Sequence, residues 1–233
     1  MKALVAGATG RTGKEIVRRL VEEGVPVTAL VRDRAKAERA LPVGSGLVTV
    51  VEGDVYQYAS LGRAFEGVNT VFCATGATDP RNVLGPYQVD YEGTRNLVAR
   101  ARLGGVQRFV LVTSIGADEV LNPLNLFWGV LLWKKRAEQD LQRSGLDYLV
   151  VRPGGLLDAP REGRALGNLV LARAGTYGLA PGAQQPEGPV LRRDVADVCV
   201  EGSVDERARN QVVEVLTDPR APKRMISELF AQL

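Results

Sequence analysis

Short, almost wholly apolar runs alternate with longer amphipathic stretches over the first 152 residues of the chain. Such an alternation is typical of βαβ units that build a parallel sheet. The near absence of polar residues in these runs is expected of strands whose two faces are both covered by helices. Strands are predicted at residues 3–6, 27–31, 47–51, 70–74, 108–113 and 148–152. Helices are predicted between them at residues 12–23, 35–41, 60–65, 87–103 and 133–144.

The pattern loosens after Pro153, where residues 154–189 are rich in Gly, Pro and Ala. Further elements are predicted as strands at 169–173 and 212–216 and as helices at 194–202 and 223–233. The 233 residues contain no internal repeat, and their 45% hydrophobic content is enough for one buried core. We predict a single α/β domain spanning residues 1–233, Rossmann-type and doubly wound, with a mostly parallel sheet and helices on both faces. Residues of about 153–190 and 212–233 are expected to form a small C-terminal substrate lobe.

A glycine-rich turn connects the first predicted strand directly to the first predicted helix. Gly7, Gly10 and Gly13 follow the G-x-x-G-x-x-G pattern, which indicates dinucleotide binding when a strand precedes it and a helix follows. The first glycine permits a tight turn, the second lets backbone approach a diphosphate, and the third lets the helix pack closely. The helix N-terminus then offers free N–H groups to the phosphates. The candidate cofactor-binding residues of this turn are Gly7, Thr9, Gly10, Arg11, Thr12 and Gly13.

The residue after the second predicted strand favours NADP over NAD. Enzymes that bind NAD usually have Asp or Glu here, which accepts a hydrogen bond from the ribose 2′-hydroxyl. In this chain the first polar residue is Arg32, whose guanidinium suits a 2′-phosphate, and Arg11 is expected to approach the same group. Asp33, one position later, would favour NAD, or it caps the helix predicted near residue 35.

Two further strand ends are predicted to border the cofactor. Asp54 and Val55 follow the third strand, where a carboxylate and the next backbone N–H suit an adenine ring. The alternative for Asp54 is an Asx-turn or a helix cap. Ala74, Thr75 and Gly76 end the fourth strand, where small residues let backbone pass close to a ribose.

The composition excludes several classes of function. The chain has no histidine and two separated cysteines, so we expect no metal site and no His-based catalysis. A net charge of +3 without a dense Lys/Arg run does not favour nucleic-acid binding. No apolar stretch reaches transmembrane length, and no signal peptide is expected before the first strand. The predicted location is cytoplasmic, or stromal if a transit peptide has been removed.

The motifs together resemble the atypical branch of the short-chain dehydrogenase/reductase superfamily. The resemblance rests on GATGRTG at 7–13, LVRD at 30–33, GDV at 53–55, VDYEGTRNLV at 89–98, VTSIGA at 112–117, the stretch 133–158 and RRDVADV at 192–198. It covers nearly the whole chain and is similar to the NmrA-like and Tic62-related proteins and to the flavin reductase (biliverdin-IXβ reductase) group. It implies an NAD(P)-binding protein, and with Arg32 the predicted cofactor is NADP(H).

The superfamily's catalytic set is only partly present. The resemblance places Ser114 at the catalytic serine and Lys134 at the lysine that also binds ribose, with Lys135 beside it. The tyrosine position is occupied by Val130, so the usual proton donor of a carbonyl reductase is missing. Ser114 could instead close a turn, and the lysine pair could be a solvated helix face. The resemblance also implies that the backbone of Pro153, Gly154 and Gly155 meets the nicotinamide amide.

Loss of the tyrosine argues against ordinary ketone reduction, because a ketone needs a proton donor at its oxygen. A flavin, quinone or similar conjugated acceptor can delocalise the incoming charge, so we predict an NADP(H)-dependent reductase of a planar small-molecule acceptor. The alternative is a catalytically weak NADP(H)-binding protein with a redox-sensing or regulatory role and a protein partner. Phe127, Trp128 and Trp133 could stack on such an acceptor or simply pack, and Tyr87 and Tyr91 are expected to pack. The sequence is compatible with a monomer or a homodimer.

Overall fold

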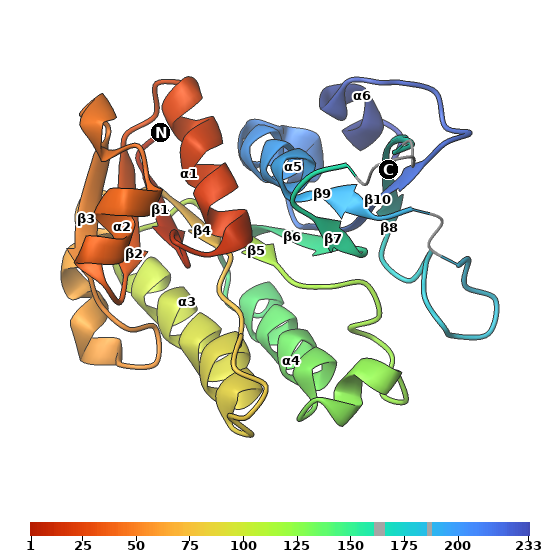
Figure 1. Cartoon of the computed structure of the whole chain (residues 1–233), viewed down its shortest axis with the longest axis horizontal. Coiled ribbons are helices and arrows are strands. Elements are labelled where there is room, and N and C mark those ends of the chain that lie inside the picture. Colours follow the sequence, from red (N-terminus) through yellow and green to blue (C-terminus); the bar gives the residue numbers. More distant parts are fainter. Residues whose placement is uncertain (161–165, 186–187) are drawn as a thin grey trace.

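The computed structural model describes residues 1–160, 166–185 and 188–233, in which eight strands form one sheet with the order β3-β2-β1-β4-β5-β6-β10-β8. All neighbours in this sheet are parallel except the edge pair of β10 and β8. Figure 1 shows the sheet with helices on both sides. The strands are β1 (Ala3–Ala6), β2 (Val27–Val31), β3 (Val48–Glu52), β4 (Thr70–Cys73), β5 (Arg108–Val112), β6 (Asp147–Pro153), β8 (Asn168–Arg173) and β10 (Gln211–Asp218). The predicted doubly wound α/β fold is confirmed.

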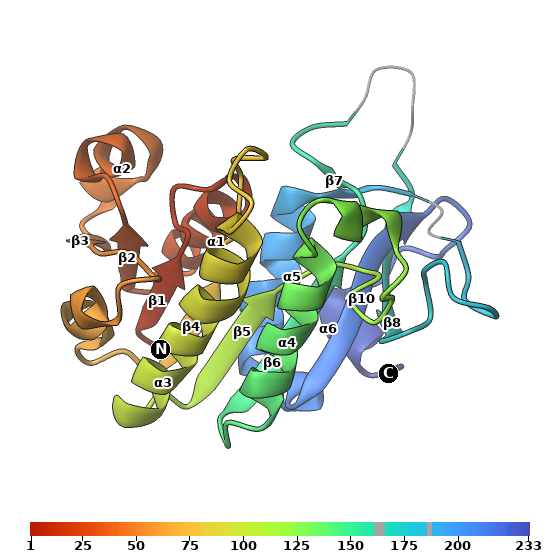
Figure 2. The same cartoon turned by 90° about the horizontal axis from the view of Figure 1, so that it is seen from below.

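The α-helices cover the two faces of the sheet in separate groups (Figure 1). They are α1 (Arg11–Glu22), α2 (Arg34–Ala40), α3 (Thr94–Leu103), α4 (Val130–Gln142), α5 (Arg192–Val204) and α6 (Ile226–Phe230). Buried residues of α1, α2, α5 and α6 form one core with the inward side chains of the sheet. A second core joins α3, α4 and the 3₁₀ segment η2 (Tyr58–Phe65) to the opposite face, and Figure 2 shows α3 and α4 lying side by side.

Short helical segments complete the connections. They are the 3₁₀ helices η1 (Val43–Ser45), η4 (Pro123–Leu126) and η5 (Glu206–Ala208) and the π-helix η3 (Pro86–Gly93). The helix predicted at 87–103 is therefore two segments, η3 and α3, because a π-helical stretch precedes the α-helix. The last predicted helix, 223–233, is shortened to the single turn of α6.

The C-terminal part contains two short strands that the sequence pattern does not predict. The two-residue strands β7 (Leu156–Leu157) and β9 (Val190–Leu191) pair in parallel outside the main sheet. Strands β10 and β8 continue the main sheet beyond β6, with β8 antiparallel at the edge. Part of the predicted substrate lobe, residues 161–165 and 186–187, lies outside the described residues, and the lobe stays a prediction.

Candidate functional site

A cavity of about 610 Å³ lies at the carboxyl ends of β1, β2 and β4. The strand order reverses between β1 and β4, and in open α/β sheets ligands bind in the crevice at such a reversal. The sequence-predicted site residues that line this cavity are Gly7, Thr9, Gly10, Arg11, Thr12, Arg32, Asp54, Val55, Ala74, Thr75, Gly76 and Lys134. Five others are not part of its lining, namely Gly13, Ser114, Pro153, Gly154 and Gly155.

The glycine-rich turn forms the floor of the cavity through close backbone contacts. Gly7 has φ +77°, a conformation that L side chains rarely adopt, and the Gly10 N–H donates to its carbonyl oxygen at 2.8 Å. A Cβ on Gly13 would lie 2.0 Å from that same oxygen. Gly13 thus lets α1 approach the turn, while Gly10, the N-cap of α1, leaves the first-turn N–H groups without a side-chain partner. These donors are suited to phosphate oxygens.

Arg32, which is predicted to bind a 2′-phosphate, lies at the cavity wall together with a second cationic side chain, Lys36. Arg32 and Lys36 both line the cavity, next to Leu30 and Val31. Asp33 accepts from the backbone N–H of Lys36 at 2.9 Å and is the N-cap of α2, as the alternative interpretation of this residue predicted. Lys36 was missed because it lies in the first turn of a helix, where an exposed lysine carries no distinguishing signal.

Arg11 lines the cavity and contacts a carboxylate at its edge. Its Nη1 lies 3.4 Å from Oδ2 of Asp158, just after β7, and its approach to a 2′-phosphate stays a prediction. Asp158 also binds Arg192, the first residue of α5, at 2.9 Å. Arg192 lines the cavity, which the sequence did not indicate.

Asp54 forms the Asx-turn that its sequence position allowed, and its contact with adenine stays a prediction. Its Oδ1 accepts from the backbone N–H of Tyr56 at 2.9 Å, which is the predicted Asx-turn. The residue also lines the cavity, beside Val55. The turn therefore positions Asp54 at the cavity wall.

Lys134 is held at the cavity by a buried carboxylate. Its Nζ lies 2.5 Å from Oδ1 of Asp90, whose side chain is only 1% exposed, and Oδ2 of Asp90 accepts from the Ala77 N–H at 3.1 Å. A Cβ on Gly76 would lie 3.7 Å from Asp90 Oδ1 and 4.0 Å from Lys134 Nζ, so the backbone passes close to the pair. Lys134 is not a solvated surface residue. Asp90 was missed because one acidic residue in a polar helix gives no sign of burial.

At the end of β5, Thr113 lines the cavity and Ser114 does not. Ser114 Oγ donates to the Ile115 carbonyl at 3.1 Å, the turn-closing alternative, and Ser114 is not in the cavity lining. Thr113 lines the cavity instead, and its hydroxyl donates to Glu138 Oε1 at 2.7 Å. Val130 is the first residue of α4 and no tyrosine is among the described residues that line this cavity.

The aromatic residues near η3 and α4 pack on one another. Trp133 stacks on Tyr91 with 5.6 Å between ring centroids and meets Tyr87 edge-on at 4.9 Å. Packing is thus confirmed for the two tyrosines. Trp128 and Phe127 remain half-exposed, and Trp128 Nε1 donates to the Pro80 carbonyl at 3.1 Å.

A buried charge cluster lies next to the site and is connected to it through Thr113, which donates to Glu138. Arg152, 1% exposed at the end of β6, binds Glu138 of α4 through Nε at 3.0 Å and Nη2 at 2.6 Å. It also binds Asp118, which pairs with Lys135 as well. Burial alone would raise the pKa of Asp118, but hydrogen bonds from Arg152 and Lys135 lower it to about 2. Glu214 of β10 accepts from the N–H groups of Gly175 and Tyr177 at 2.7 and 2.8 Å, so the cluster anchors that loop.

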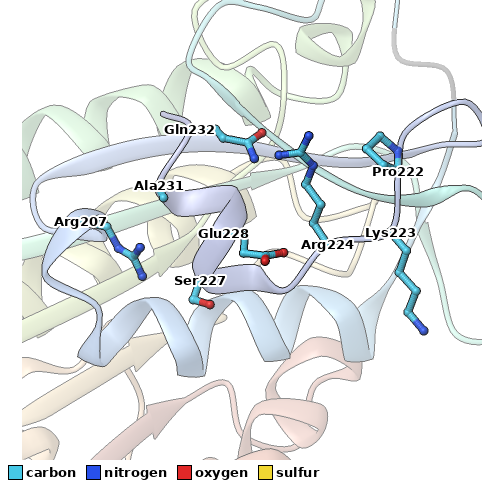
Figure 3. Close-up of a pocket in the computed structure, with 8 residues that line it drawn as sticks. All are labelled: Arg207, Pro222, Lys223, Arg224, Ser227, Glu228, Ala231 and Gln232. Atoms are coloured by element: carbon cyan, nitrogen blue, oxygen red, sulfur yellow. The ribbon is translucent and has the colours of Figure 1, made fainter.

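A second hollow of about 510 Å³ lies around α6 (Figure 3). It carries Arg207, Lys223 and Arg224, and Glu228 there caps α6 by accepting from the Met225 N–H at 2.9 Å. None of the sequence-predicted site residues lies in it. It is an open surface feature without the glycine-rich turn, and the candidate site is the first cavity.

Within the described residues no group of three or more Cys, Asp or Glu side chains is placed to hold a metal ion. Cys73 and Cys199 are both buried, and burial raises the pKa of each thiol. No helix in the part of the chain that the structure describes is long and apolar enough to cross a membrane.

Comparison with known families agrees with the geometry of the first cavity. Residues 7–206 match the family model described as NAD(P)H-binding. The chain belongs to the NAD(P)H-binding family. Its relatives include a Tic62 protein and a reductase. They confirm the predicted atypical short-chain dehydrogenase/reductase branch, with its NmrA-like and Tic62-related proteins.

Three relatives show the range of this branch. The chloroplastic protein At2g34460 of Arabidopsis thaliana is 39% identical over the whole chain and 82% of its own length. Protein TIC 62 of Pisum sativum, also chloroplastic, is 33% identical over 98% of the chain, which spans only 45% of that relative. Sanguinarine reductase of Eschscholzia californica is 28% identical over 94% of the chain and 90% of its own length.

Solved structures show the same fold. A protein from Bacillus halodurans described as a putative NAD-dependent epimerase/dehydratase superimposes with a TM-score of 0.82 at 24% identity, covering all of both chains. ChuY, an anaerobillin reductase from Escherichia coli O157:H7, gives a TM-score of 0.73 at 25% identity over 95% of this chain and all of its own. The chain therefore falls in an NAD(P)H-binding family that includes reductases.

Proposed function

We propose that the protein is an NADPH-dependent reductase that passes hydride to a planar conjugated acceptor, such as a flavin or a quinone, without a catalytic tyrosine. One observation carries the proposal. The cavity above the glycine-rich turn has Arg32 and Lys36 at its wall and the paired ammonium of Lys134, but no tyrosine in its described lining.

The residues present fit the cofactor. Backbone N–H groups of Arg11 and Thr12 suit the diphosphate, and Arg32 with Lys36 suits a 2′-phosphate. Lys134, fixed by Asp90, suits the hydroxyls of the nicotinamide ribose. NADPH, when bound, supplies a hydride, and the protein contributes position and charge.

The acceptor class follows from the missing phenol. Lys134 can stabilise negative charge nearby, but its ammonium is already paired with Asp90, and the phenol that would protonate a ketone oxygen is missing. A conjugated ring spreads the charge of the incoming hydride and takes its proton from water. The half-exposed rings of Phe127 and Trp128 offer stacking surfaces for such an acceptor. The names of the relatives sanguinarine reductase and ChuY, an anaerobillin reductase, support this class.

The test is a comparison of acceptors with the purified protein. NADPH oxidation, followed by the loss of its near-ultraviolet absorbance, is measured with FMN, quinones, biliverdin and simple ketones offered separately. We expect turnover with one or more of the conjugated acceptors and none with the ketones. Tight NADPH binding without acceptor-dependent oxidation would overturn the reductase and favour the second candidate.

The second candidate is an NADP(H)-binding protein that reports redox state to a protein partner. Val130 at the position of the superfamily tyrosine favours it, because the cavity can then bind cofactor with little chemistry. Both the reductase and the redox-reporting role are compatible with a monomer or a homodimer. A cytoplasmic location is proposed, and the chloroplastic names of two relatives support the stroma as the alternative.

A further inference from the structure

Two arginines from distant parts of the chain meet one carboxylate at the edge of the cofactor cavity. Asp158 directly follows β7 and Arg192 directly follows β9, and these strands pair in parallel with Leu157 opposite Leu191. The register therefore places Asp158 and Arg192 side by side, with 2.9 Å between Oδ1 and Nη1. The second oxygen of Asp158 faces Nη1 of Arg11 at 3.4 Å.

Both arginines stand where a helix disfavours positive charge. Arg11 is the first residue of the 12-residue α1, and Arg192 is the first residue of the 13-residue α5. Helix N-termini attract anions and repel cations. An anion between two such cations offsets the unfavourable charge, and in this structure that anion is the Asp158 carboxylate.

The exposure of the three side chains is unequal. The Arg192 side chain is 8% exposed, whereas those of Asp158 and Arg11 are 54% and 70% exposed. Asp158 can turn to water at little cost, because ion pairs of exposed groups contribute little. Arg192 cannot leave, and a buried guanidinium without an anion is costly. This place therefore needs an anion, but not necessarily this carboxylate.

The position of Arg11 and Arg192 in the cavity indicates which anion fits between them. Arg11 and Arg192 both line the cavity, together with Gly10 and Thr12 of the glycine-rich turn. Arg32, just after β2, and Lys36, on α2, also line it and can hold a 2′-phosphate independently. The remaining phosphates of the cofactor are those of its diphosphate.

Resting on the proposed NADP(H) binding, we propose that Arg11 and Arg192 form an anion subsite for the cofactor diphosphate. Asp158 is a competing carboxylate that occupies this subsite until the diphosphate displaces it. Arg192 is then a cofactor-binding residue contributed by α5, and Asp158 weakens cofactor affinity while stabilising the empty site.

The test measures dissociation constants of two probes, NADP⁺ and adenosine 2′-monophosphate, which lacks the diphosphate. Arg192→Gln should raise the Kd of NADP⁺ by about tenfold or more, the effect of one charge-assisted contact. It should leave the Kd of adenosine 2′-monophosphate unchanged. The matched control is Arg193→Gln, the exposed neighbour that pairs with Asp194 and lies outside the cavity lining, and it should leave both constants unchanged.

Asp158→Asn provides an independent variant on an exposed residue. It should lower the Kd of NADP⁺ by about two- to fivefold at low ionic strength, in the range of a half-exposed ion pair, and the gain should shrink as salt is added. Asp147→Asn, which removes an equal charge beside Arg209 at the start of β6, should have no effect.

The outcomes separate the two proposals. If wild-type protein binds neither probe, NADP(H) binding itself fails. If wild-type protein binds NADP⁺ and both Arg192→Gln and Asp158→Asn leave its Kd unchanged, the diphosphate subsite is wrong and NADP(H) binding stands.

Discussion

Lys134 of α4 and Asp90 of η3 form an ion pair with 2.5 Å between Nζ and Oδ1, at the wall of the cofactor cavity. The second oxygen of Asp90 accepts from Ala77, just beyond β4. One buried carboxylate therefore links α4 to the backbone that follows β4. The pair fixes the ammonium where a ribose is expected, and it also contributes to the fold.

Lys134→Met should lower the free energy of unfolding by about 3–5 kcal/mol, since it leaves the buried Asp90 carboxylate without its cation. Adding Asp90→Asn should recover part of this loss, because the uncompensated charge is then removed. Urea unfolding of both single variants and of the double variant measures the coupling. Lys14→Met, at an exposed position of α1, is the control and should be close to wild type. A Lys134→Met variant as stable as this control would show that the pair does not hold the fold.

Asp118 should make stability depend on acid pH. Its folded pKa is about 2, against 3.8 for the ordinary group, because the hydrogen bonds from Arg152 and Lys135 outweigh its burial. A lowered pKa stabilises the fold above the ordinary value, and this contribution is lost as the pH falls through the folded value. Wild type should thus be more stable than Asp118→Asn at neutral pH, and the difference should shrink between about pH 4 and pH 2.

The measurement is the free energy of unfolding of wild type and Asp118→Asn in urea at several pH values. Taking the difference cancels the other carboxylates that titrate in the same range. A difference that stays constant from neutral pH down to about pH 2 would contradict the assigned contacts.

Gly13→Ala should disrupt the turn, because the new Cβ would lie 2.0 Å from the Gly7 carbonyl oxygen. Forcing an extra methyl group into a packed region costs about 1–3 kcal/mol, and α1 must shift away from the phosphate-binding backbone. We expect both lower stability and weaker NADPH binding, measured by thermal unfolding and by fluorescence titration. Gly62→Ala is the matched control, since its Cβ would meet nothing within 4 Å. Equal behaviour of the two variants would refute the tight-turn role of Gly13.

Most of the main sheet could be predicted from the sequence, because a strand covered by helices on both faces is apolar at most positions. Strands β1 and β2 begin and end at the predicted residues, and the other predicted strands differ by a few residues. The two-residue strands β7 and β9 were missed, since two residues define no period. The π-helical turn of η3 was also missed, because its sequence pattern resembles that of an α-helix.

The backbone part of the site was predictable and the side-chain pairs were not. Glycines in the turn are required by local geometry, and local geometry is encoded in neighbouring residues. Asp90 and Arg192 act through partners far away in the chain, Lys134 and Asp158, and no local pattern reports such pairing. The motif around Ser114 matches the superfamily, while its hydroxyl closes a turn in this structure, so its catalytic role stays a prediction.

The account depends most on the claim that this cavity binds NADP(H) and that Arg32 at its wall reads the 2′-phosphate. The most direct measurement is the ratio of the dissociation constants of NADH and NADPH for wild type and Arg32→Ala. Arg34→Ala, which loses its contacts to Glu52 and Val50 outside the cavity lining, is the control. We predict a clear preference for NADPH that Arg34→Ala retains and that Arg32→Ala reduces by roughly 1.5–3 kcal/mol. An equal affinity for both dinucleotides in wild type, or an unchanged ratio in Arg32→Ala, would contradict it.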